Sequence, residues 1–329
     1  MKKFLGLILI PIVLLSSCGI TKSTTEETNS GYMFIKNINH YVLEPDDKII
    51  LSEEEYDGYK KLMDTMLSGK EKVKLSVDKN KIQILLDLLK QSPYYFFVSS
   101  LDAKENEILF EYKFSKEEQK DKLKIMDDKF LEIVNFQADE DDNQLDHMLK
   151  IYRYITKNYK YDYSRTDNVQ LGSPLFTYPD DEVYNMIIDK KTHCQGFSFM
   201  ITFTFLQYDI DCFSVYGQCT AHDEGHMWNV FKYDDEYFAC DSAWDISENG
   251  YSKLYHFGKT DNERLVDTLV PVDFLSYHNK QYGNVECSDE RFKLFRNVSR
   301  YTVAGKHRYF CETHNKERIF DSEKFDWVE

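Results

Sequence analysis

The 329-residue chain has little glycine and proline, with 13 and 6 residues respectively. These low counts exclude a collagen-like or linker-dominated chain. Basic residues are also scarce, because 41 Lys and Arg stand against 57 Asp and Glu and give a formal net charge of −16. Such a surplus of acidic charge excludes nucleic acid as a partner, since attraction to phosphates dominates that binding. No Cys-x-x-Cys pair occurs, so we predict no structural zinc site and expect neither a cofactor nor another metal.

Apolar and aromatic residues are plentiful, at 42% and 15% of the chain. This content suffices for hydrophobic cores, and a chain of this length fits two modest domains. The 24 Tyr and 23 Phe favour β-rich packing, because aromatic side chains fill pleated surfaces well. We therefore expect an α+β protein.

The first residues have the pattern of an export signal. Met1-Lys-Lys supplies positive charge, Phe4–Leu15 is an apolar run, and Leu15-Ser-Ser-Cys18 follows. The last motif resembles the lipobox of bacterial lipoproteins, in which the cysteine becomes the acylated first residue. An ordinary signal peptide and a single membrane anchor are the alternatives, but the apolar run is short for a spanning helix. We predict a signal peptide over 1–17, lipidation of Cys18, and a location at the outer face of a bacterial cell membrane.

Two regions that follow carry no recognisable chemistry. Residues 18–30 are polar and lack apolar periodicity, which predicts a flexible tether. Residues 31–140 are predicted to form an N-terminal α+β domain of unknown role. Its expected helices cover 52–67, 79–91 and 115–136, and its expected strands cover 73–77, 94–99 and 108–114.

The acidic run at 138–142 predicts a domain boundary. A calcium-binding loop is the alternative, but the run lacks the ligand spacing of an EF-hand. We assign 141–270 to a catalytic domain and 271–329 to a β-rich extension with a hairpin around Ala304-Gly305. The catalytic domain is expected to contain helices over 146–158, 182–188 and 197–208, a loop over 171–181, and strands over 212–217, 226–231 and 237–241.

Cys194 stands just before an apolar and aromatic helix. A helix N-terminus carries about half a positive charge, which favours a thiolate. Its free N–H groups can also hold the oxyanion of a tetrahedral intermediate. We expect Gly196 to let the backbone approach the substrate closely. Cys194 is the predicted nucleophile, although a cysteine considered alone is more often an inert buried thiol.

His226 and Asp241 lie on the two strands of a predicted hairpin. With a loop over Lys232–Asp235, His226 pairs directly with Asp241, and any other even-length loop still leaves both side chains on one face. The carboxylate would fix the tautomer of the imidazole, which would serve Cys194 as base and later as acid. Asn229 falls on the opposite face and is predicted to be structural.

Several neighbours have weaker claims to a role. Gln195, Trp228 and Trp244 are candidates for substrate binding, with core packing as the alternative for each tryptophan. His222 is a rival base, but it lies in a loop without a paired acid. His193 is expected to be a helix-entry residue that could also modulate the thiolate.

The chain has seven cysteines. With Cys18 lipidated and Cys194 a free nucleophile, five remain, and an odd number cannot all pair within the chain. Cys212 and Cys240 lie in apolar runs and are expected to be buried thiols. A bridge between Cys219 and Cys240 stays open.

Three motifs together resemble those of the bacterial transglutaminase-like family of the papain-like thiol superfamily: Cys194-Gln-Gly-Phe, Gly225-His-Met-Trp-Asn and Asp241-Ser-Ala-Trp. The resemblance covers residues 143–265, including the helix and the Tyr-Asp segment before the cysteine. It implies a core in which the helix carrying Cys194 packs on an antiparallel sheet carrying His226 and Asp241. It also implies that these residues are nucleophile, base and orienting acid in acyl transfer or amide hydrolysis through a thioester.

These observations predict a lipid-anchored thiol enzyme that acts on amide bonds of proteins or peptides, with cell-wall peptides among the candidates. Cysteine peptidase and transglutaminase-like acyltransferase activity both stay open, and hydrolysis is slightly favoured because water is abundant outside the cell. The alternative is a catalytically silent binding module for proteins or cell-wall peptides.

Overall fold

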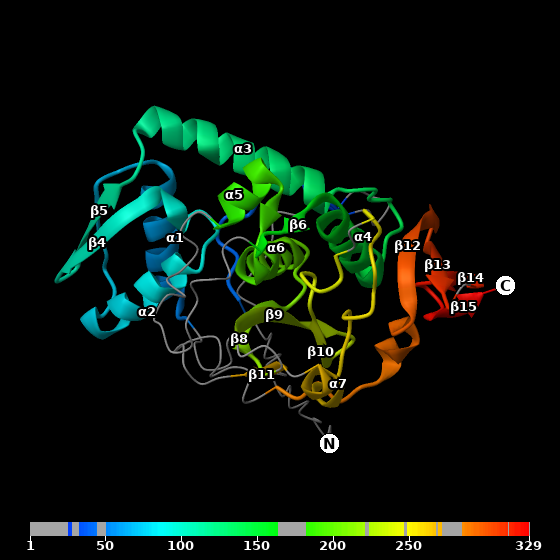
Figure 1. The fold of residues 1–329 in the computed structure, drawn as a ribbon. Helices are drawn as coiled ribbons and strands as arrows, with labels where there is room; N and C mark the ends of the chain where they lie inside the picture. The colour runs from blue at the N-terminus through cyan, green and yellow to red at the C-terminus, as the bar shows by residue number, and fades with distance from the viewer. Residues whose placement is uncertain are drawn as a thin grey trace, which may run out of the picture.

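The computed structural model describes residues 26–27, 33–44, 51–163, 182–220, 224–246, 249–267, 269–271, 285–314 and 316–328. The predicted signal peptide with Cys18, the loop over 171–181, and His222 lie outside these residues. An N-terminal part, a central part and a C-terminal sheet follow one another across the molecule (Figure 1). Within the described ranges, no helix is both long and apolar enough to cross a membrane.

The N-terminal part packs three helices around a small antiparallel sheet. The helices are α1 (Glu53–Leu67), α2 (Lys79–Lys90) and α3 (Lys116–Val134), and the sheet has the order β3 (Lys72–Lys74), β5 (Glu107–Tyr112), β4 (Val98–Lys104). Both α1 and α3 begin at capping boxes, in which Ser and Glu side chains bond the free N–H groups of the first turn. Their predicted starts are confirmed for this reason.

One expectation for the N-terminal part is wrong. The strand expected over 94–99 begins only at Val98, after the 3₁₀ turn η1 (Tyr95–Phe97). Phe96 and Phe97 are adjacent and both fully buried, which a strand with alternating faces does not allow when one face meets solvent. Next to this part, β1 (Glu26–Glu27) pairs with β2 (Met33–Phe34), and the tether predicted over 18–30 stays a prediction.

The central part places α6 (Cys194–Leu206) on a four-stranded antiparallel sheet (Figure 1). The sheet has the order β10 (Glu236–Cys240), β9 (Glu224–Tyr233), β8 (Cys212–Cys219), β11 (Leu269–Pro271). Every residue of α6 is buried, as expected for a helix that is apolar on all sides. Next to it lie α4 (Gln144–Asn158), α5 (Glu182–Asp189) and the parallel pair β6 (Lys160–Tyr161) and β7 (Lys191–Thr192), whereas α7 (Asp261–Val266) contacts β11. The expected fold class is therefore confirmed.

One apolar core runs through the N-terminal and central parts. The ring of Phe203 on α6 lies 4.5 Å from that of Phe130 and 5.8 Å from that of Tyr94. The hydroxyl of Tyr208 also donates to the carbonyl of Val134 on α3, at 3.0 Å. The hydrophobic core thus continues across residue 140, and the domain boundary predicted there stays a prediction.

The C-terminal part is the antiparallel sheet β12 (Val298–Gly305), β13 (Arg308–Thr313), β14 (Lys316–Asp321) and β15 (Asp326–Val328), preceded by the 3₁₀ turn η3 (Arg291–Phe295). The hairpin expected around Ala304-Gly305 is β12–β13. Fully buried Asp146 on α4 holds this sheet, because it contacts Nδ1 of His307 at 2.6 Å and accepts from the hydroxyls of Tyr309 and Ser322.

Candidate active site

The hairpin β9–β10 brings His226 and Asp241 together, although its register differs from the predicted one. The turn is Asp234-Asp235, with φ of 51° and 64°, a left-handed geometry that aspartate tolerates. Asn229 pairs with Cys240, so the predicted four-residue loop and the direct 226–241 pairing are wrong. The difference amounts to two residues. Because side chains alternate with period two, His226 and Asp241 still share a face.

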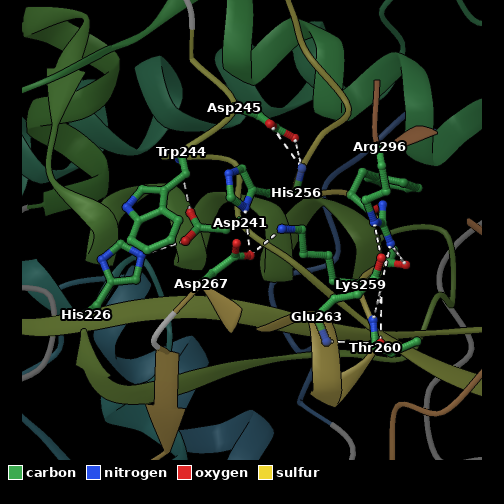
Figure 2. A network of polar contacts seen from close by, with 12 residues as sticks. His226, Asp241, Trp244, Asp245, His256, Lys259, Thr260, Glu263, Asp267 and Arg296 are labelled. Atoms are coloured by element: carbon green, nitrogen blue, oxygen red, sulfur yellow. Dashed lines mark hydrogen bonds and ion pairs between the residues drawn. The ribbon is translucent and has the colours of Figure 1, made fainter. Parts of the chain in front are cut away.

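The imidazole of His226 is bound to the carboxylate of Asp241. Nε2 of His226 lies 2.6 Å from Oδ2 of Asp241, and their side chains are 6% and 5% exposed. The other carboxylate oxygen accepts the backbone N–H of Trp244 at 3.2 Å. Both oxygens of Asp241 are therefore engaged, which fixes the orientation of the acid and of the ring that it holds (Figure 2).

Cys194 is the first residue of α6, so the helix begins three residues before its predicted start at 197, and Cys194 is 6% exposed. Its side chain hydrogen-bonds with the imidazole of His226. Burial disfavours the imidazolium, but the charge of Asp241, followed by that of Cys194, outweighs burial and holds the pKa of His226 well above its ordinary value. The arrangement therefore keeps a proton on the imidazole that meets the sulfur of Cys194.

Tyr161 contributes to the site and was assigned no role from the sequence. The parallel pairing of β6 with β7 sets Tyr161 beside Thr192, two residues before Cys194. Its hydroxyl hydrogen-bonds with the side chain of Cys194 and accepts the backbone N–H of the same residue. Burial, then the charge of Cys194, raises the pKa of Tyr161, so the phenol keeps its proton. The tyrosines before Cys194 could have drawn attention to this segment. The pairing of β6 with β7 that brings Tyr161 to the site cannot be recognised from sequence, because each strand has two residues.

The two tryptophans occupy different surroundings. Trp228 is 1% exposed and lies in a small core with Phe213 and Val215, which favours the packing alternative. Trp244 is half-buried, and its ring centre lies 4.9 Å from that of His226. Trp244 is the tryptophan that borders both the imidazole and the solvent side of the site.

The remaining predicted neighbours lie at the start of α6. Gln195 is buried in the first turn, and His193 is the N-cap residue without a side-chain capping bond. The structure gives a packing reason for Gly196: a Cβ there would lie 2.3 Å from Oγ1 of Thr192 on β7. Glycine is needed at this position because the helix packs against β7.

The structural role predicted for Asn229 agrees with its contacts. Its amide donates to the carbonyl of Ser198 at 2.9 Å and to Oγ1 of Thr202 at 2.8 Å, both on α6. These bonds fix the helix on the sheet.

The six described cysteines are buried, and none of them forms a disulfide within the described residues. The bridge between Cys219 and Cys240 that the sequence left open is therefore not formed in this structure. Burial raises the pKa of Cys212 and of Cys240 well above the ordinary thiol value, in agreement with the buried thiols expected there. In the part of the chain that the structure describes, no cluster of three or more His, Cys, Asp or Glu side chains could hold a metal ion.

A cysteine at the head of a helix, facing a histidine and an aspartate from an antiparallel sheet, is the arrangement of a papain-like thiol core. Residues 129–260 match a family model described as "Transglutaminase-like domain". This segment is a transglutaminase-like domain, and the resemblance seen in the sequence is confirmed.

Comparisons with individual proteins give more distant likenesses. No curated protein matches the chain. A crystal structure of a TGase is 16% identical, with a TM-score of 0.33, and the match covers 54% of this chain and 50% of that one. A candidate cysteine protease from Cytophaga hutchinsonii is 15% identical, with a TM-score of 0.28 and coverage of 38% and 40%. LapG from Legionella pneumophila is 14% identical, with a TM-score of 0.24 and coverage of 39% and 62%. The chain thus spans half the length of the TGase structure.

Proposed function

We propose that this protein is a thiol enzyme that acts on amide bonds of proteins or peptides through a thioester on Cys194. The observation that carries the proposal is the buried, hydrogen-bonded series of Cys194, His226 and Asp241. A nucleophile bonded to a base, and a base oriented by a third group, are what nucleophilic catalysis requires.

The first step is attack on the amide carbonyl. The sulfur of Cys194 forms a bond to the carbonyl carbon, and the carbonyl oxygen takes the negative charge. The protonated imidazole of His226 then gives its proton to the leaving amine, and the C–N bond breaks. In hydrolysis, a water molecule forms a bond to the thioester carbon and gives one proton to His226. The C–S bond then breaks, which releases the carboxylic acid and returns the sulfur of Cys194 to the protonated imidazole.

The oxyanion needs donors that point at it before the reaction begins. The backbone N–H of Cys194 stands in the first turn of α6, where an N–H has no carbonyl partner within the helix. The hydroxyl of Tyr161 already lies at this N–H and at the sulfur. We assign Tyr161 as the second donor, which passes from the thiolate to the oxyanion as charge moves.

The acceptor of the acyl group and the place of the reaction belong to the same proposal. The sequence pattern at Leu15–Cys18 supports a lipid anchor on the outer face of a bacterial membrane. Water is abundant there, so we favour hydrolysis of peptide or isopeptide bonds over amine transfer. Cell-wall peptides are one substrate class that this location offers.

One experiment tests whether the protein is active and whether it transfers the acyl group to water or to an amine. Purified protein is incubated with a glutamine peptide library and a labelled primary amine, and both cleavage and label incorporation are measured by mass spectrometry. Cleavage that is lost in Cys194→Ala supports the proposal. Efficient amine incorporation with little cleavage would replace hydrolysis by acyl transfer. Absence of both, with sluggish and equal alkylation of all thiols, would indicate a binding module.

A further inference from the structure

Trp244 lies between two imidazole rings (Figure 2). One side faces His226 at a ring-centre distance of 4.9 Å and an angle of 32°, and the other meets His256 at 5.2 Å and 77°. The backbone N–H of Trp244 also donates to Asp241. Trp244 therefore contacts both members of the His226–Asp241 pair, and its position depends on what lies behind it.

His256 is fixed by its backbone to the segment that carries the acid. Its N–H donates to the carboxylate of Asp245, with distances of 3.1 and 3.0 Å to the two oxygens. Its carbonyl accepts the backbone N–H of Asp241 at 3.1 Å. Asp245 is fully buried and accepts the hydroxyl of Tyr152 on α4 at 2.8 Å. The backbone of His256 is thus joined to two of the aspartates near the site.

The ring of His256 is held by a second charged group. Nδ1 lies 3.4 Å from Oδ2 of Asp267, which also forms an ion pair with buried Lys259. Tyr255 packs edge-on against the same ring at 4.8 Å. Burial opposes ionisation of Asp267, but His256 and Lys259 outweigh it and lower its pKa. The ring is therefore enclosed on several sides by charged and aromatic groups that limit its orientation.

We propose that His256, braced by Asp267 and Lys259, is a positioning residue that holds Trp244 against the imidazole of His226. This inference rests on the proposed function, because it concerns the same catalytic pair. His256 acts through Trp244, so its ring packing rather than proton transfer is what matters. Loss of the ring lets Trp244 and the imidazole move away from the geometry in which His226 meets the sulfur of Cys194.

The chain offers a matched control for this test. His40 has the same kind of surroundings in the N-terminal part, with Nε2 2.9 Å from Oδ1 of Asp127 and an edge-on contact to Tyr94 at 5.0 Å and 81°. Its side chain is 20% exposed and that of His256 is 13% exposed. His40→Ala therefore removes a comparable ring, ion pair and aromatic contact away from the site.

The variants are His256→Ala, His256→Phe and His40→Ala in the full chain. Two quantities are measured: kcat on a cleaved peptide, and the alkylation rate of Cys194 by iodoacetamide as a function of pH. We expect His256→Ala to lower kcat roughly tenfold, because small displacements of a catalytic group are costly. Its alkylation midpoint should move to higher pH. His256→Phe keeps the ring and should stay within about threefold of the wild type, as should His40→Ala.

Wild-type kcat and an unmoved alkylation midpoint in His256→Ala would overturn the inference. So would equal losses in His256→Phe and His256→Ala, because ring packing would then not be the cause. The alkylation profile needs no substrate. A wild type that cleaves nothing, yet whose Cys194 alkylation midpoint moves in His256→Ala alone, would refute the proposed function while supporting the positioning role.

Discussion

The N-terminal and central parts are both helices packed on antiparallel sheets. An ion pair on the N-terminal sheet is exposed, whereas the His226–Asp241 pair of the central part is buried. On the N-terminal sheet, Lys72 and Glu107 form an ion pair with side chains 68% and 44% exposed. In the central part, His226 and Asp241 are paired at 6% and 5% exposure. The first pair stays in solvent, and the second is enclosed by the fold.

The difference bears on where chemistry can occur. Exposed pairs are screened by water and contribute about 0–1 kcal/mol. Burying a charge costs several kcal/mol, and the attraction to a partner does not always offset this cost. Apolar residues of similar size therefore often stabilise a core better than a buried ion pair does. Buried pairs close to a free thiol are therefore a reason to look for function in the central part. The predictions below test this contrast, beginning with the largest expected effect.

Cys194→Ala should lower peptide cleavage by about 10⁴-fold or more, because the thioester can no longer form. Cleavage rates of the purified variant check this prediction. Adding His226→Ala should cause little further loss, since the two residues act as a unit. Cys287→Ala, which removes another buried thiol, is the control and should keep the wild-type rate. A Cys194→Ala variant with a tenth of the wild-type activity would remove Cys194 from the mechanism.

Asp241→Asn should lower kcat by about 10³- to 10⁴-fold, because the amide no longer stabilises the imidazolium or fixes its tautomer. The carboxylate is the largest of the causes that raise the pKa of His226, so the histidine pKa should fall in this variant. NMR titration of the ring measures it. A raised folded pKa adds stability at pH below the unfolded value, and this stability is lost as pH rises through the folded value. Asp241→Asn should therefore lose more stability at pH 5 than at pH 9, and the reverse order would contradict the assignment.

Lys150→Ala tests a buried pair that has no part in the proposed reaction. Nζ of Lys150 lies 2.6 Å from both carboxylate oxygens of Asp142, and the side chains are 6% and 1% exposed. Removing the lysine leaves a buried carboxylate whose remaining donor is the backbone N–H of Asp139, so the free energy of unfolding should fall by about 3–5 kcal/mol. Urea unfolding measures the change. A loss below about 1 kcal/mol would mean that this pair behaves like an exposed one.

Tyr161→Phe should lower kcat by roughly 10²-fold, since the removal of one oxyanion donor typically has an effect of this size. KM should change little, because the lost bond strengthens only as negative charge develops on the oxygen. Tyr163→Phe is the matched control: this neighbour is 76% exposed, and its ring centre lies 4.9 Å from that of Tyr161. Equal effects of the two substitutions would show that the hydroxyl of Tyr161 has no special role.

That His226 and Asp241 lie on one face could be predicted from sequence, because it depends only on whether the turn has an even number of residues. A turn of two or four residues changes the register but not the face that a side chain occupies. The helix after Cys194 could also be predicted from sequence, because the apolar and aromatic residues that form it are continuous. Capping boxes located α1 and α3 for the same local reason.

Contacts between segments that are distant in the sequence could not be predicted from such local patterns. Tyr161 reaches Cys194 through a parallel pairing of two-residue strands, whose sequences carry no periodicity. His256 and Asp267 meet behind Trp244 because the chain passes along the edge of β10, where Lys259 pairs with Ala239. Their side chains are ordinary polar residues until the fold brings them together. Local patterns thus predicted the reactive residues, and only the structure placed the groups that support them.

The smallest effect is expected on the N-terminal sheet. Lys72→Ala and Glu107→Ala should each change the free energy of unfolding by about 0.5 kcal/mol or less, and the double-mutant cycle should give a similarly small coupling energy. Nζ of Lys72 lies 3.7 Å from Oε1 of Glu107 with both groups in solvent, so water and salt replace the interaction readily. Urea unfolding at low and high salt measures the coupling, which should disappear at about 1 M salt. A coupling above about 1 kcal/mol that survives salt would contradict the contrast between the two parts, because an exposed pair would then stabilise the protein as a buried one does.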